Sequence, residues 1–266
     1  MAIRLRDRQA SRKALTMSGT MLKWTGLLLT CLSSLSVAVL QRGLLKMDSY
    51  STVEEMTEAL AISTDGARSL ASMAVTCSLI SAMALPLYAK LVYEGWMRME
   101  EKKPFFLRLL LCALISEVPY DLAMSGTVWE PAIQNPAWGL FLCAAMLEVI
   151  RLPKPRSRFA SGLLQVLIVA GALTWSLLLQ VYLGPVMILL VTLFYYMAGN
   201  KTFATLGGAL LTFPQFPAPL GMLVVHWYAP DEDREDKRPN LFYILYPAQL
   251  LVFGIIGLLL KNWGAA

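Results

Sequence analysis

Long apolar runs separated by short polar segments dominate the chain. A helix needs about 20 apolar residues to cross a hydrocarbon core about 30 Å thick. Strand-type alternation is absent from these runs, and a segment in lipid must satisfy its own backbone hydrogen bonds. The pattern therefore predicts an all-α fold, a polytopic transmembrane helix bundle of about eight spans. The predicted spans are 21–40, 69–93, 105–124, 137–150, 161–180, 184–199, 202–228 and 241–260.

Composition agrees with a membrane protein. Hydrophobic residues make up 57% of the chain and charged residues 15%, whereas a soluble domain is about 45–50% apolar and about 25% charged. No stretch has the composition of a soluble core. We therefore expect residues 1–266 to form a single integral membrane domain.

The polar segments alternate in charge along the chain. Lysine and arginine collect on the cytoplasmic side of a membrane, so the alternation predicts a plasma-membrane protein with both termini in the cytoplasm. Residues 1–20 form a basic tail, for which we expect membrane lipid rather than nucleic acid as the partner. Residues 41–68 are expected outside the cytoplasm, with a short surface helix near 51–62. The remaining basic segments are 94–108, 151–158 and 200–201, and the remaining acidic ones are 121–130 and 231–238.

Few residues suggest soluble-enzyme chemistry. The chain has one histidine, His226, and four isolated cysteines, which argues against histidine-based metal sites, Ser-His-Asp triads and a disulfide framework. No metal cofactor is therefore expected. Aromatic residues near the predicted span ends are typical of a headgroup belt. They are Trp24, Trp96, Trp129, Trp138, Trp227, Tyr228 and Trp263.

Glu117 is the most informative polar residue, because it lies well inside the predicted span 105–124. An intramembrane carboxylate is costly unless it is paired or protonated, and such residues commonly mark functional sites. The alternative is a structural clamp to a neighbouring helix. Pro119 leaves a backbone carbonyl free one turn earlier, so the helix can bend beside a cavity here.

Several motifs resemble a known family. The block from Ile115 to Leu122 reads I-S-E-V-P-Y-D-L, and the segment from Phe242 to Leu250 reads F-Y-I-L-Y-P-A-Q-L. Together with Leu85-Pro86, Glu94-Gly95 and Arg108-Leu109, they resemble the TraX family of membrane proteins, which includes a conjugation-system protein credited with N-acetylating pilin. That family is similar to the larger membrane acyltransferase superfamily.

The resemblance implies an acyl transferase that uses acetyl-CoA as donor and a peptide or other small molecule as acceptor. It implies a catalytic site at Ser34, Glu117 and Gln249. It implies substrate-binding roles for Arg108, Tyr120, Asp121, Asn135 and Tyr246.

The chain departs from the family pattern at the expected bases. Ser33 and Ser34 stand where the family has Asp-His, and Gln249 stands in place of a histidine. A middle Asp-Tyr-Gly appears only as Tyr182-Leu183-Gly184. Acyl transfer needs a group that takes a proton from the nucleophile, and neither serine nor glutamine does so at neutral pH.

Three functions therefore remain open. The first is a membrane acyltransferase with Glu117 in its site, and the second is a catalytically degenerate relative that acts as a binding or accessory subunit. The third is a small transporter, although the paired interrupted helices of transporters are not evident in the sequence. The presence or absence of a side chain that can take the proton from the nucleophile distinguishes the first hypothesis from the second.

Helix rise places the three catalytic candidates at one depth. Ser34 and Glu117 lie about 18 Å from the start of their spans, and Gln249 lies about 16–17 Å from the end of its span. We therefore predict that they line one shared cavity, with Tyr120 and Tyr246 as neighbours. The alternative is that each side chain bonds its own helix.

Overall fold

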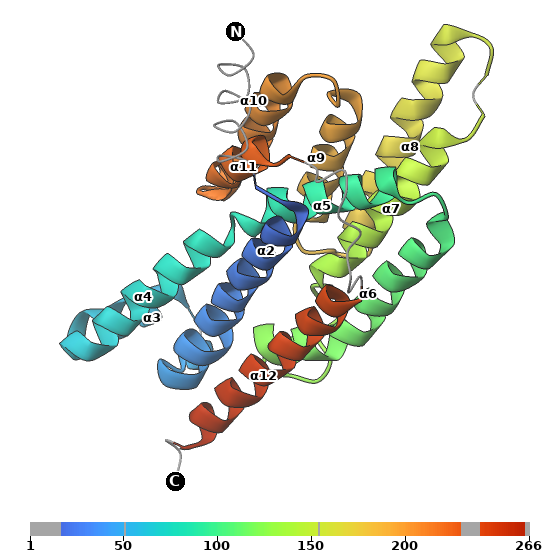
Figure 1. Ribbon diagram of the computed structural model, residues 1–266. Helices are drawn as coiled ribbons and strands as arrows, with labels where there is room; N and C mark the ends of the chain where they lie inside the picture. The colour runs from blue at the N-terminus through green and yellow to red at the C-terminus, as the bar shows by residue number, and fades with distance from the viewer. Residues whose placement is uncertain (1–16, 51, 154, 230–239, 264–266) are drawn as a thin grey trace, which may run out of the picture.

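The computed structural model describes residues 17–50, 52–153, 155–229 and 240–263, and in these residues it is all-α, without a β-strand (Figure 1). The predicted all-α helical bundle is confirmed. Four helical stretches are long and apolar enough to cross a membrane: Gly19–Leu44, Asp65–Arg98, Arg158–Leu178 and Leu241–Trp263. The elements in chain order are α2 (Gly19–Ser34), η1 (Leu35–Leu44), η2 (Met47–Ser49), α3 (Val53–Ile62), α4 (Asp65–Ser81), α5 (Ala84–Arg98), α6 (Lys102–Met124), α7 (Pro136–Arg151), α8 (Arg158–Leu178), α9 (Gly184–Tyr196), α10 (Lys201–Thr212), η3 (Phe213–Gln215), α11 (Ala218–Trp227) and α12 (Leu241–Trp263).

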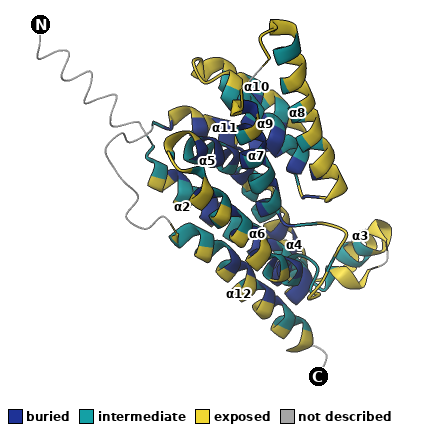
Figure 2. Ribbon diagram, turned by 90° about the vertical axis from the view of Figure 1, so that its right-hand side faces the viewer, coloured by how far each residue is buried: buried dark blue, intermediate teal, exposed yellow. Residues whose placement is uncertain are grey.

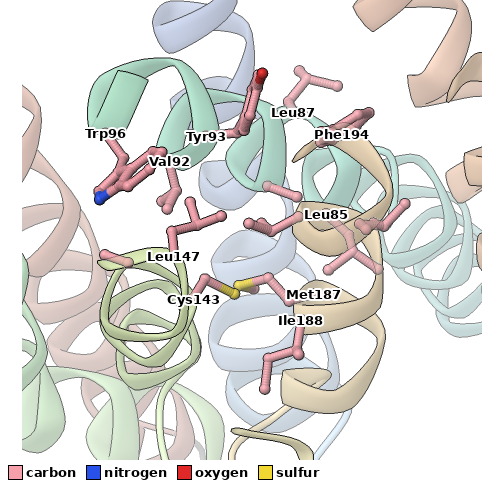
Figure 3. Close-up of a cluster of buried hydrophobic side chains, with 14 of the residues drawn as sticks. Leu85, Leu87, Val92, Tyr93, Trp96, Cys143, Leu147, Met187, Ile188 and Phe194 are labelled. Atoms are coloured by element: carbon pink, nitrogen blue, oxygen red, sulfur yellow. The ribbon is translucent and has the colours of Figure 1, made fainter. Parts of the chain in front are cut away.

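The main apolar core lies where α5, α7 and α9 meet (Figure 3). Leu87, Leu147 and Ile188 are fully buried there. By contrast, α8 lies at the edge of the bundle, and its outward face is exposed (Figure 2). An apolar exposed face on an apolar helix is what lipid contact requires.

The first span changes its winding half-way. α2 continues directly into η1, a π-helix of 10 residues. Because a π-helix bonds residues five apart, it brings Ser36 and Gln41 to one face. The Gln41 amide donates to the Ser36 hydroxyl at 2.9 Å, and that hydroxyl donates to the carbonyl of Ala74 in α4 at 2.7 Å. The π-helix thereby joins the first span to the second.

α12 packs between η1 and α6 through two glycines. A Cβ at Gly257 would lie 2.2 Å from the carbonyl oxygen of Ala38, and one at Gly254 would lie 3.1 Å from the backbone nitrogen of Ala123. Small residues let membrane helices approach this closely. These two contacts fix the register of α12 against both neighbours.

The predicted span 202–228 doubles back and is not a single crossing. It consists of α10 and α11, joined by η3, and these two helices lie side by side in opposite directions. Met222 packs against Gly208, and nearer the ends Lys201 Nζ donates to the carbonyl of Tyr228 at 3.0 Å. At 1.5 Å per residue, helices of 12 and 10 residues are about 18 and 15 Å long, half of a bilayer core.

The turn of this hairpin suits an apolar environment. It contains Pro214 and Pro217, and Pro219 follows at the start of α11. Proline has no backbone N–H, so each one removes a donor that hydrocarbon could not satisfy. The apolar run therefore looks like a span in the sequence, although the chain returns to the end from which it entered.

Two ends of the bundle can be distinguished. The basic end carries Arg98, Lys102, Arg151 and Lys201, whereas the opposite end carries Asp48, Glu130 and Lys261. We use these two names below.

The first and last described helices run in the same direction. The rings of Trp24 and Phe242 lie 5.1 Å apart near the basic end, and Lys261 pairs with Asp48 at 2.6 Å at the opposite end. Gly19 and Trp263 therefore lie at opposite ends of the bundle (Figure 1). The termini themselves lie outside the described residues, but Gly19 and Trp263 do not share one end of the bundle, as eight crossings would require, because the hairpin of α10 and α11 returns to the basic end.

The segment 41–68 agrees with its prediction of a short helix, α3. The Thr52 hydroxyl accepts a hydrogen bond from the backbone N–H of Glu55 at 3.2 Å and caps it. Residues 1–16 of the basic tail and the acid-rich segment 231–238 lie outside the described residues.

Candidate functional site

Glu117 is held between α6 and the start of α7. The indole Nε1 of Trp138 donates to Glu117 Oε2 at 2.9 Å, and the amide of Asn135 donates to the same oxygen. The other oxygen, Oε1, is buried and has no hydrogen-bond partner among the described residues. Glu117 is therefore bonded through one oxygen only.

Asn135 positions this carboxylate from a fully buried site. Its side-chain oxygen accepts from the backbone N–H of Ala137 at 2.9 Å and so caps α7, which begins at Pro136. Its Nδ2 donates to the carbonyl of Ala113 at 3.0 Å. Because a buried asparagine must satisfy its whole amide, Asn135 acts as the clamp between α6 and α7.

Gln249 on α12 has a buried side-chain amide at the same level of the bundle as Glu117. Both its Oε1 and its Nε2 are buried without a partner among the described residues. The register puts it level with Glu117. Gly254 packs against Leu122, and Gln249 and Glu117 each lie five residues earlier, about 7.5 Å along parallel helices.

Ser34 lies fully buried at the junction of α2 and η1. Its hydroxyl donates to the carbonyl of Thr30 at 3.1 Å, so it bonds its own helix. Ala38 packs against Gly257, which places Ser34 within about 6 Å of the level of Gln249. The common depth agrees with the register, but no direct hydrogen bond among the described residues joins the three catalytic candidates. Their shared cavity stays a prediction.

The two predicted tyrosine neighbours pack in this layer. Tyr120 is buried in a cluster with Val39 and Leu250. Tyr246 packs against that cluster and also against a second one, formed by Cys112, Ala113 and Ala137, on which Trp138 packs as well. Tyr246 therefore lies where α12 meets the helix that carries Glu117.

Asp121 and Arg108 lie on either side of this layer on α6. Asp121 follows Glu117 by one turn, and its Oδ2 accepts the backbone N–H of Glu130 at 2.9 Å. Arg108 precedes Glu117 by nine residues, about 14 Å along the axis. Among the predicted substrate-binding residues, Arg108 is therefore the one that the fold places away from the others.

Sequence reasoning missed two polar partners. Trp138 was assigned to a headgroup belt, yet it donates to Glu117. The segment Asn135-Pro136 is a helix-start signature, and that signal would have placed Trp138 on the first turn of α7. Arg42 lies in the polar segment 41–68 and no sequence motif singled it out, although it is 6% exposed and donates to the carbonyls of Leu122 and Ala123.

Comparison with known proteins identifies the family. The family described as TraX protein matches residues 18–257, most of the chain. No curated protein and no solved structure matches it. The matched range includes both the α6 block with Glu117 and the α12 segment with Gln249. This chain is therefore a membrane protein that belongs to the TraX family.

Proposed function

We propose that this protein transfers an acetyl group from acetyl-CoA to a primary amine of a peptide or small molecule, with Glu117 as the general base. The observation that carries the proposal is the buried Glu117 Oε1, which has no hydrogen-bond partner among the described residues. A buried polar atom without a partner is costly. A substrate that supplies a proton to this oxygen removes that cost.

The unpartnered atoms also favour an amine as the acceptor. Glu117 Oε1 and Gln249 Oε1 accept hydrogen bonds, and Gln249 Nε2 donates one. An ammonium group with a carbonyl beside it has the complementary donors and acceptor. The start of a peptide chain presents both groups within one residue, and this arrangement supports a peptide acceptor.

The chemistry then needs one base and no metal ligand from the chain. Glu117 takes a proton from the ammonium and leaves a neutral amine, whose nitrogen attacks the thioester carbonyl carbon. The C–N bond forms, the C–S bond breaks, and a second N–H proton goes to the departing thiolate, which leaves as the free thiol. Positioned acid–base catalysis of this kind contributes about 10²–10⁴-fold to a rate.

The proposed orientation puts the basic end in the cytoplasm of a cell with this protein in its plasma membrane. The positive-inside rule supports this orientation, since Arg98, Lys102, Arg151 and Lys201 all lie there. Acetyl-CoA would then approach from the basic end. The described end of α12 would lie on the outer side.

A binding or accessory role is the second candidate, and Ser34 favours it. Its hydroxyl is occupied by the Thr30 carbonyl at 3.1 Å and is fully buried. The position that matches a family histidine therefore offers no base. In this reading, Glu117 and Gln249 bind a peptide amine without transferring an acyl group to it.

The test is transfer of labelled acetyl from acetyl-CoA by the purified protein in lipid nanodiscs, with native membrane extract as the source of acceptors. Wild type should label an amine acceptor, and Glu117→Gln should lower turnover by about 10²–10⁴-fold with the fold intact by circular dichroism. Glu58→Gln on α3 is the matched control. Binding of acceptor without labelling would favour the accessory role, and full activity of Glu117→Gln would place the base elsewhere.

A further inference from the structure

Three cationic side chains gather around Tyr228 at the basic end. Tyr228 directly follows α11, which packs beside α5 (Figure 1), and it is buried. Arg98 Nη2 donates to its hydroxyl at 3.2 Å, and Lys201 Nζ donates to its backbone carbonyl at 3.0 Å. The Lys90 ammonium lies 5.8 Å from the centre of its ring. One buried tyrosine thus brings together cations from α5 and from the start of α10.

Lys90 is the member of this group whose charge is compensated. Its Nζ pairs with Glu94 at 2.8 Å, and the rings of Tyr93 and Phe194 lie 4.8 and 5.3 Å from the ammonium. A carboxylate and aromatic faces both stabilise a cation. Glu94 is the one carboxylate that the ion pairs of the described residues place in this group, so three cations share one negative charge.

Arg98 and Lys201 keep donors that no described residue uses. Arg98 Nε lies 3.7 Å from Glu94, beyond hydrogen-bond distance. A guanidinium has five N–H groups and an ammonium has three, and in each of the two side chains one of them bonds Tyr228. Both side chains reach the surface, since that of Arg98 is 42% exposed and Lys201 is exposed. The remaining donors are therefore accessible to a ligand.

A phosphate group is the ligand that fits these donors. It carries negative charge and several acceptor oxygens, which arginine and lysine bind through charge-assisted hydrogen bonds. α10 has 12 residues and begins at Lys201, so the positive end of its helix dipole adds to the charge of the two side chains.

This group of side chains lies at the end of the bundle from which α6 runs towards Glu117. Gly95 on α5 is close to the start of α6, because an added Cβ would lie 3.0 Å from the ring of Phe105. Glu117 follows Phe105 by 12 residues, about 18 Å along the axis. A donor held at both places must therefore be long, with phosphates at one end and the reactive carbonyl at the other. Acetyl-CoA has this form, since its pantetheine arm separates the diphosphate from the thioester.

We propose that Arg98 and Lys201 bind the phosphate groups of the nucleotide part of the acyl donor, and that Tyr228 holds the two side chains in place. The identity of the donor rests on the proposed function. The phosphate of an anionic lipid has the same chemistry, so the test separates the two sources.

The first test uses the wild-type protein in nanodiscs of neutral phosphatidylcholine, with reductive methylation of lysines read by mass spectrometry. Coenzyme A should protect Lys201 and leave Lys103, an exposed lysine at the same end, unprotected. Pantetheine, which lacks the phosphates, should protect neither. Protection of both lysines or of neither by coenzyme A overturns the site. Protection of Lys201 by added anionic lipid, but not by coenzyme A, would assign the phosphate to the membrane and overturn the nucleotide site.

The second test measures the affinity for coenzyme A in the same nanodiscs. Arg98→Gln and Lys201→Gln should each weaken binding at least about 10-fold, because each loses a charge-assisted hydrogen bond. Arg98→Lys and Lys201→Arg should bind more tightly than the glutamine variants. Arg68→Gln and Lys261→Gln, at the opposite end, are the matched controls and should bind as wild type. Unchanged affinity in both glutamine variants overturns the site.

These outcomes distinguish this proposal from the proposed function. If wild type binds coenzyme A with protection of Lys201 but transfers no acetyl group, the proposed function fails and the phosphate site stands. If wild type transfers acetyl groups while Arg98→Gln and Lys201→Gln bind coenzyme A normally, the proposed function stands and the phosphate site fails.

Discussion

The indole Nε1 of Trp138 donates to Glu117 Oε2 at 2.9 Å, so the first turn of α7 holds the carboxylate of α6 from the side. Trp138→Phe keeps the ring and removes the donor. A hydrogen bond to a charged group contributes about 1.5–3 kcal/mol, and we expect a loss of this size in the free energy of unfolding, measured in detergent with chemical denaturant. Trp263→Phe is the control, since that side chain is 85% exposed. Equal stability of the two variants would contradict the contact.

A pair of glycine variants tests the packing of α12. Gly257→Ala places a Cβ 2.2 Å from the carbonyl oxygen of Ala38, which cannot move without η1. We expect it to destabilise the protein by about 1–3 kcal/mol through overpacking. Gly171→Ala on α8 has nothing within 4 Å of the new Cβ, and should stabilise that helix by up to about 1 kcal/mol. Thermal unfolding in one detergent compares them, and a shift of the same sign in both would argue against the register of α12.

The hairpin makes a prediction about sidedness. Single cysteines replace Lys103, Lys201, Glu58 and Asn262 in a variant whose native cysteines are serine. In sealed vesicles a membrane-impermeant maleimide should label Lys103→Cys and Lys201→Cys from one side, and Glu58→Cys and Asn262→Cys from the other. Labelling of Asn262→Cys from the same side as Lys103→Cys would restore an eighth crossing.

Returning histidine to the two family positions should have unequal effects. Gln249→His replaces an amide that has no partner for either polar atom among the described residues. We expect it to fold normally and to raise acetyl transfer, because it adds a base level with Glu117. Ser34→His must fit an imidazole ring where serine has a hydroxymethyl group, in a fully buried site. It should therefore destabilise the protein by about 1–3 kcal/mol. Turnover and melting temperature of both variants check this, and a stable, active Ser34→His would show room beside α2.

The positions of the helices follow from the apolar runs in the sequence, but the number of times the chain passes from one end of the bundle to the other does not. All eight predicted apolar spans are helical. The direction of travel within 202–228 depended on Pro214, Pro217 and the packing of Met222 on Gly208, contacts between residues that hydropathy treats alike. Depth likewise placed Glu117, Gln249 and Ser34 in one layer, because helix rise is regular.

Side-chain partners were harder to predict than depth. Ser34 bonds its own helix at the junction of α2 and η1, instead of Glu117 or Gln249. No sequence pattern predicted a π-helix after that junction. Trp138 illustrates the same limit, since its ring suits a headgroup belt and a buried hydrogen bond equally well. The buried hydrogen bond forms because Asn135 caps the start of α7 and bonds the carbonyl of Ala113, which places Trp138 beside α6.

The hairpin of α10 and α11 leaves by the end at which it enters, so it adds no net crossing to the chain. Its removal or exchange would leave the orientation of α12 unchanged, whereas loss of one crossing helix would invert everything that follows it. A change in the length of the hairpin from Asn200 to Ala229 should therefore leave the direction of α12 unchanged, and with it the level of Gln249 beside Glu117.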